Sequence, residues 1–78
     1  MDWRARIKID PSICHGKACI AGSRVMVSVV LDNLASGETL QTIAEQYHIA
    51  VEDVQAALEY ASELAKERVL PPLASGAT

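Results

Sequence analysis

The sequence predicts a mainly α-helical fold, a small three-helix domain with a helix-turn-helix and short N-terminal β-strands. Two observations support this prediction. From Thr39 to Arg68, apolar residues recur at helical spacing in two stretches joined by about four residues, which is the helix-turn-helix pattern. Before them, short β-branched stretches lie between glycines and prolines, as is typical of short strands.

Three short strands are expected in the N-terminal third. Alternation over residues 6–10 places Ile7 and Ile9 on one buried face, and Pro11 ends this strand because it has no amide hydrogen. Residues 18–20 and 25–27 are the other two candidates. Strands of three residues are weak alone, so a helix or a second copy of the chain has to lie against them.

Three helices follow the strands. Ser28 is the expected N-cap of the first, which runs over 29–36 and ends where Gly37 can adopt the left-handed conformation. Thr39 is expected to cap the second helix, and the third runs from residues 51–53 to about Val69. The faces expected to be buried are Val30, Leu31 and Leu34 in the first helix, Leu40, Ile43, Ala44 and Tyr47 in the second, and Val54, Ala57, Leu58, Ala61 and Leu64 or Ala65 in the third.

Seventy-eight residues make one domain. Residues 1–6 are expected to be a flexible N-terminus, 7–69 the helix-turn-helix domain, and 70–78 a flexible tail containing prolines. Hydrophobic residues make up 50% of the chain, although a chain this short buries only roughly 60% of its unfolded surface. A homodimer is therefore expected, because self-association would cover the remaining aliphatic side chains.

The net charge of −3 conceals an asymmetry between the two parts of the chain. Residues 1–26 carry five basic and two acidic side chains, a charge of +3, whereas residues 27–78 carry two basic and eight acidic, a charge of −6. Any nucleic-acid contact is therefore expected in the first third. The sequence shows neither an apolar run near the ~20 residues of a membrane span nor a signal peptide, so we expect a cytoplasmic protein without membrane contact.

Cys14, His15 and Cys19 invite interpretation as a metal site. A closed zinc site needs four ligands, and the chain offers only His48 as a further histidine and no second cysteine pair. Cys14 and His15 are neighbours, so in an extended chain they would point to opposite faces, and His15 would not activate the thiol. Reduced cysteines that pack beside a turn are the favoured interpretation. We expect no metal, no cofactor, no catalytic residue and no enzyme activity.

Residues 9–27, IDPSICHGKACIAGSRVMV, are followed by LASGETLQTIAEQY and EDVQAALEYA. Together they resemble the bacterial domain-of-unknown-function 433 family, whose pattern is I-D-P…C-x-G-K-P-x-I-x-G-T-R-[IV]-x-V, then L-A-x-G, then a helix-turn-helix closing on A-A-L-x-Y-A. The likeness covers Ile7 to Ala61. It implies a homeodomain-like or winged-helix-like fold and an antitoxin, often encoded beside a PIN-like nuclease toxin. The chain departs from the pattern at Ala18, where the family has proline, and in residues 47–50, which lack a capping side chain for the third helix.

DNA contact is expected from the basic N-terminal arm and strand rather than from the third helix. That helix begins with Glu52 and Asp53, which would repel phosphates, and offers only Gln55 to a base edge. Arg24 has a favoured structural alternative, a hydrogen bond or salt bridge that fixes the turn before it. The candidate DNA-binding residues are Arg4, Arg6, Lys8, Arg24 and Gln55.

Two functions remain open. The first is a non-catalytic antitoxin-like protein that binds a PIN-like nuclease toxin, with operator DNA as a further candidate partner. The second is a protein-interaction or dimerisation module whose helix-turn-helix does not bind DNA. The candidate residues for a protein partner are Glu59 and Glu63 on the third helix and Leu70 and Leu73 in the tail, because aliphatic residues beyond a helix end are typical of segments that order on a partner.

Overall fold

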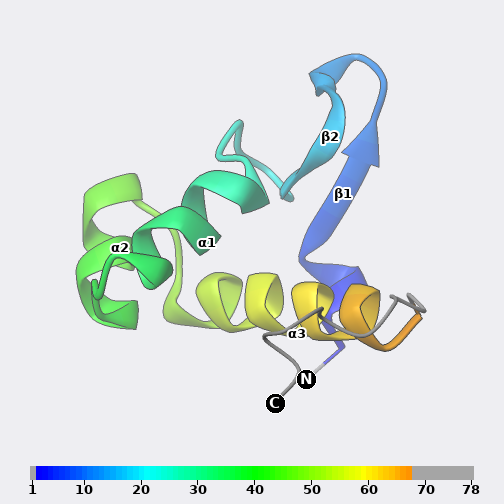
Figure 1. The fold of residues 1–78 in the computed structure, drawn as a ribbon. Helices are drawn as coiled ribbons and strands as arrows, with labels where there is room; N and C mark the ends of the chain where they lie inside the picture. Colours follow the sequence, from blue (N-terminus) through cyan, green and yellow to red (C-terminus); the bar gives the residue numbers. More distant parts are fainter. Residues whose placement is uncertain (1, 68–78) are drawn as a thin grey trace.

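The computed structural model describes residues 2–67 and shows a small, mainly α-helical domain with short N-terminal strands, as predicted (Figure 1). A β-hairpin lies over the C-terminal half of the longest helix, and the two shorter helices lie over its other half. The elements in order are the 3-10 helix η1 (Trp3–Ala5), the strands β1 (Ile7–Asp10) and β2 (Ile13–Ile20), and the helices α1 (Val27–Ala35), α2 (Leu40–Tyr47) and α3 (Val51–Glu67).

The two strands form an antiparallel hairpin whose register pairs Ile7 with Ile20 and Ile9 with Ala18. At its tip, the carboxylate of Asp10 accepts hydrogen bonds from the amide of Ser12 at 2.8 Å and from its hydroxyl at 2.7 Å. Both bonds stabilise the charged carboxylate, so they lower the pKa of Asp10 below its ordinary value. Pro11 therefore lies in a hairpin turn, and the expected strand 18–20 is the end of the longer β2.

Two expectations about the strands were wrong. Residues 25–27 do not form a third strand: Met26 makes a single bridge to Cys19, and Val27 already begins α1. Ile9 is 60% exposed, whereas Ile7 on the same face is buried. Ile7 and its partner Ile20 both belong to the core, whereas in the next pair along the hairpin Ala18 packs against the core and Ile9 stays exposed.

Helix α1 begins two residues earlier than the sequence predicts. Its N-cap is Met26, without a side-chain hydrogen bond, and the expected cap Ser28 lies exposed in the first turn. Burial of Val27 in the core outweighs the cap that Ser28 could have formed. The C-terminus is as predicted: Gly37 has a φ of 96°, and the amide of Glu38 donates to the carbonyl of Asn33 at 3.1 Å.

The caps of the other helices are local and well defined. The hydroxyl of Thr39 accepts from the amide of Thr42 at 3.1 Å, which confirms the predicted cap of α2. Ala50 offers α3 no capping side chain, as expected, but Asp53 reaches back and its carboxylate accepts from the amide of Ala50 at 2.9 Å. The predicted end of the helix at Val69 lies outside the described residues.

The core lies where the hairpin and all three helices meet. Its buried residues are Ile7, Cys19, Ile20, Val27, Val30, Ile43, Ala44, Val54, Ala56 and Ala57. The expectation that Leu58 is buried was wrong, since it is 43% exposed. The buried arc of α3 is rotated toward Ala56 and Tyr60, because η1 and β1 pack on that side of the helix. No helix within residues 2–67 has the length and apolar character needed to cross a membrane.

Candidate functional site

The N-terminal segment, expected to be flexible, packs on α3. Trp3 meets Tyr60 edge to face with ring centroids 5.1 Å apart, and the guanidinium of Arg4 lies 4.7 Å from the centroid of Trp3. The guanidinium of Arg6 donates to a carboxylate oxygen of Asp53 at 3.0 Å. One face of α3 is therefore covered by residues that precede the hairpin, and Arg6 serves this contact.

The five candidate DNA-binding residues do not form one surface. Arg6 is paired with α3, whereas Lys8 shares a face of the hairpin with Cys19, its partner in the register. Arg24 lies in the turn after β2, where its backbone carbonyl accepts from the thiol of Cys14. Arg4, Lys8, Arg24 and Gln55 are exposed. Of the proposed set, the structure thus engages Arg6 with α3 and leaves the side chains of Lys8 and Arg24 exposed on the hairpin and on the turn that follows it.

The turn before Arg24 is closed by a serine hydroxyl. Ser23 donates to the carbonyl of Ile20 at 2.9 Å, and its oxygen accepts from the amide of Val25 at 3.1 Å. The sequence-based interpretation assigned this structural task to the side chain of Arg24. The contact that Arg24 contributes is instead its backbone carbonyl, which accepts from the thiol of Cys14.

Cys14 and Cys19 belong to β2, and their thiols contact this same turn. The Cys14 thiol donates to the carbonyl of Arg24 at 3.4 Å, and the Cys19 thiol donates to the carbonyl of Ser23 at 3.9 Å. Burial raises the pKa of the Cys19 thiol, and the neighbouring Cys14 side chain raises it further. Both cysteines are free thiols.

The backbone at Cys14 and His15 is not extended, contrary to the premise drawn from the sequence. Both residues have positive φ, 53° and 55°, so the rule that strand neighbours alternate between faces does not apply to them. His15 is exposed. Within residues 2–67, no three His, Cys, Asp or Glu side chains gather closely enough to hold a metal ion.

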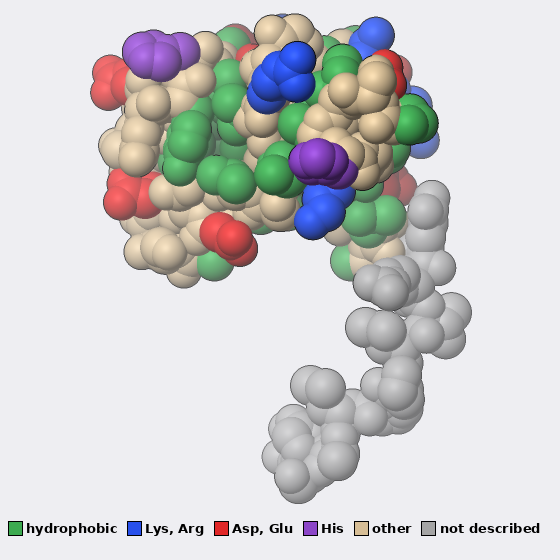
Figure 2. Space-filling model, turned by 90° about the horizontal axis from the view of Figure 1, so that it is seen from above, with side chains coloured by type: hydrophobic (Ala, Val, Ile, Leu, Met, Phe, Trp, Pro, Cys, Tyr) green, Lys and Arg blue, Asp and Glu red, His purple; other side chains and the backbone are tan. Residues whose placement is uncertain are grey.

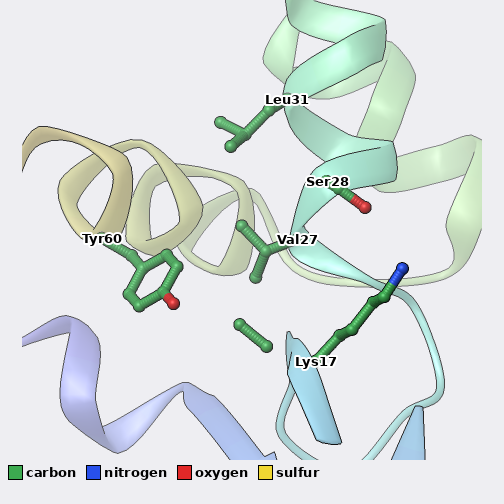
Figure 3. A pocket seen from close by; sticks show the side chains of 6 residues that line it. Lys17, Val27, Ser28, Leu31 and Tyr60 are labelled. Carbon is green, nitrogen blue, oxygen red and sulfur yellow. The ribbon is translucent and has the colours of Figure 1, made fainter. Parts of the chain in front are cut away.

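A surface cavity of about 220 Å³ lies between β2, α1 and α3 (Figure 3). Tyr60 forms one side, Val27 and Leu31 lie opposite its ring, and the polar ends of Lys17 and Ser28 lie on the far side of Val27. Ala18 completes the lining. The cavity joins residues far apart in the sequence, and no local pattern could have predicted it. An apolar group with a nearby negative charge fits this lining.

The C-terminal half of α3 carries the described candidate residues for a protein partner. Glu59 and Glu63 are half-buried there, and Leu58 and Leu64 are 43% and 42% exposed. Leu64 follows Tyr60 by one helical turn, so it continues the packed side of α3 past the part that the other elements cover. Leu70 and Leu73 lie outside the described residues. On the face seen in Figure 2, hydrophobic side chains form a further band between acidic side chains at the α2 end and basic ones near the hairpin.

Comparison with known proteins places this architecture in a family. A family model described as a protein of unknown function (DUF433) matches residues 7–61. The chain belongs to the DUF433 family. The crystal structure of Rv2018 from Mycobacterium tuberculosis is similar to this DUF433 member, with 33% identity and a TM-score of 0.62. The similarity covers 67% of this chain and 24% of Rv2018, so the chain spans about a quarter of that protein. A comparison with curated proteins returns no match.

The DUF433 match contains some of the candidate residues and leaves others out. The hairpin, both thiols and the whole lining of the cavity lie within residues 7–61. Arg4 and Arg6 precede the matched region, and Glu63 and Leu64 follow it. The contact between Arg6 and Asp53 therefore joins a residue outside the matched region to one inside it.

Proposed function

We propose that this DUF433 member is a non-catalytic, antitoxin-like cytoplasmic protein that binds a PIN-like nuclease toxin as a homodimer. The observation that supports the proposal best is the exposed C-terminal half of α3. Two large aliphatic side chains, Leu58 and Leu64, are over two-fifths exposed on a helix that also carries Glu59 and Glu63. A single exposed leucine needs no explanation, but a helix that combines exposed leucines with carboxylates suits an apolar and basic partner surface.

The chemistry of the partner follows from that combination. A nuclease binds a polyanion, so the surface around its active site is basic and attracts carboxylates. An acidic helix that occupies this surface would exclude the nucleic acid without any catalytic step. The resemblance noted for the sequence supplies the identity of the partner, and the leucines supply the apolar contact that holds it.

A binding experiment with matched charge reversals tests this proposal. The chain is co-expressed with the product of the adjacent open reading frame, and the affinity of the complex is measured by calorimetry. Glu59→Lys with Glu63→Lys should weaken binding at least tenfold, about 1.4 kcal/mol. Glu38→Lys with Glu45→Lys makes the same charge change on exposed residues away from α3 and should have little effect.

Two results would contradict the toxin proposal. One is an equal loss of affinity with both charge reversals, which would indicate long-range attraction instead of contact at α3. The other is the absence of a complex with the neighbouring gene product, which would favour the alternative, an interaction module with a different partner. Truncation after Arg68, measured in the same way, gives the contribution of Leu70 and Leu73 to the affinity of the complex.

We propose operator DNA as a second ligand, bound at the hairpin rather than at α3. The supporting observation is that Lys8 on β1, Arg24 in the turn after β2, and Arg4 are all exposed. If each contacts a phosphate, Lys8→Ala and Arg24→Ala should each flatten the dependence of log K on log salt by ~0.9. Gln55→Ala should leave that slope unchanged. Slopes that stay the same in both basic variants would remove DNA from the proposal.

A further inference from the structure

The two cysteines hydrogen-bond to consecutive carbonyl groups. The thiol of Cys14 donates to the carbonyl of Arg24 and that of Cys19 to the carbonyl of Ser23. The sulfur atoms are therefore neighbours over a single turn. Nothing in the proposed binding to a toxin or to DNA uses them.

The backbone is what brings the two thiols together. Residues 14 and 19 are separated by an odd number of positions, so in a regular strand their side chains would point to opposite faces. Cys14, His15 and Gly16 instead have φ values of 53°, 55° and 78°, and this run in the left-handed region turns Cys14 toward Cys19. For the two residues other than glycine, this conformation is strained, because Cβ comes too close to the following carbonyl oxygen. Strained backbone of this kind often marks a functional site.

The two thiols differ in access to solvent. Cys14 is half-buried, so a small reagent can reach its sulfur, whereas Cys19 is buried. The buried position holds the pKa of Cys19 above its ordinary value and makes it a poor first nucleophile. This difference in access makes Cys14 the sulfur that reacts first. Cys19 is then the resolving sulfur, which attacks the oxidised Cys14.

We propose that Cys14 and Cys19 form a dithiol site that reacts with hydroperoxides and closes to an intramolecular disulfide. The Cys14 sulfur attacks one oxygen of hydrogen peroxide, the O–O bond breaks, and Cys14 sulfenic acid and water result. The Cys19 sulfur then attacks the Cys14 sulfur, the S–O bond breaks, and hydroxide leaves with the Cys19 proton as a second water. Two electrons pass from the sulfurs to the peroxide oxygens.

Closure has a defined effect on the hairpin. A disulfide has no thiol hydrogen, so the carbonyls of Ser23 and Arg24 both lose a donor. The turn that carries Arg24 is then held by the Ser23 hydroxyl and by the bond between the Ile20 amide and the Val25 carbonyl. The modification therefore acts on this turn and leaves the helical core in place.

Mass spectrometry of the full chain tests the proposal directly. The folded protein is treated with hydrogen peroxide, denatured and alkylated with iodoacetamide before its intact mass is measured. The expected product has lost the mass of two hydrogen atoms, carries no alkyl group, runs as a single chain on a non-reducing gel, and is restored by dithiothreitol. A product linked between two chains, or one in which both cysteines still alkylate, would overturn the proposal.

Two controls separate the geometry from the chemistry of the cysteines. Cys19→Ala should stop at the sulfenic acid of Cys14, which dimedone traps, whereas Cys14→Ala should leave Cys19 unoxidised and open to alkylation after denaturation. The wild-type chain in urea keeps the same sequence spacing but loses the left-handed run, so closure there should be slower by roughly tenfold. Equal rates in the folded and unfolded chains would show that the fold does not build this site.

Discussion

Asp53 serves two contacts with one carboxylate. One oxygen accepts from the guanidinium of Arg6 at 3.0 Å, and the other accepts from the amide of Ala50 at 2.9 Å. The first contact ties the segment before the hairpin to α3, and the second satisfies an amide at the start of that helix. The side chain of Asp53 is only 16% exposed and that of Arg6 is 39% exposed, so solvent screens this pair less than a pair on the open surface.

Removing either partner of this ion pair should destabilise the fold by different amounts. Arg6→Ala loses the ion pair and should lower the free energy of unfolding by about 1 kcal/mol. Asp53→Ala also loses the helix cap and should cost about 2 kcal/mol. Urea denaturation of both single variants and the double variant measures the coupling, expected to be about 0.5–1 kcal/mol. Arg4→Ala, which changes an exposed side chain, serves as the control. Strictly additive losses of unfolding free energy in the double variant would contradict the contact between Arg6 and Asp53.

The role of Arg6 shows what the sequence could not reveal at this scale. Asp53 is 47 positions away in the chain, and nothing near either residue indicates the other. The same holds for the thiols, where an extended backbone was assumed and a left-handed one is found. The cap at Thr39 could be predicted because its hydroxyl and the amide it accepts from are only three residues apart.

Helix α2 ends in a residue that is poorly suited to its conformation. His48 has a φ of 56°, in the left-handed region, and its amide donates to the carbonyl of Ala44. This position shapes the turn between α2 and α3, and glycine occupies it most often in helices of this type. The side chain of His48 is exposed, so it contributes little packing in return.

His48→Gly should therefore stabilise the domain. Glycine adopts the left-handed conformation without a steric penalty from Cβ, at some cost in the entropy of the unfolded chain, and the net gain should be about 0.5–1 kcal/mol. Thermal unfolding followed by circular dichroism measures the change. His48→Ala keeps the Cβ and serves as the matched control, expected to show no gain. A less stable glycine variant would mean that the imidazole makes a contact that outweighs the strain.

The helices themselves were largely predictable because their signals are local. The stop at Gly37 and the buried face of α2 follow from glycine geometry and from periodicity. The start of α1 and the rotation of α3 were not predictable in this way. Both depend on tertiary packing, Val27 entering the core in one case and η1 covering the side of Ala56 and Tyr60 in the other.

At the scale of the whole molecule, the hairpin is the part best suited to self-association. A two-stranded ribbon leaves backbone groups on its outer edges open to another strand. Ile9 on β1 is 60% exposed in addition, which makes it the most exposed of the large hydrophobic side chains described here. Pairing between two hairpins would cover both features, and it would leave the C-terminal half of α3 free for the proposed partner.

Light scattering coupled to size exclusion should show the homodimer, with about twice the 8.4 kDa mass of the chain at micromolar concentration. Ile9→Lys should give a folded monomer, because it places a charge at the centre of the proposed contact. Leu64→Lys makes the same kind of change on α3 and should leave the dimer intact. A monomeric wild type, or a dimer lost only with Leu64→Lys, would place the association elsewhere or exclude it.

The packing of other elements on helix α3 affects how the domain unfolds locally. The elements η1, β1, α1 and α2 all pack on it, so its central amides can exchange their hydrogens with solvent only when most of the structure is lost. The hairpin tip beyond the pair of Ile9 and Ala18 contributes no buried residue to the core and is tied to the rest of the fold by contacts of Cys14 and Lys17, so we expect it to open at a lower free energy than the helices. The expected behaviour is that of one cooperative unit with an arm that opens first. The exposed strand edge and Cys14 both belong to that arm, so a partner strand or an oxidant can reach them without unfolding the core.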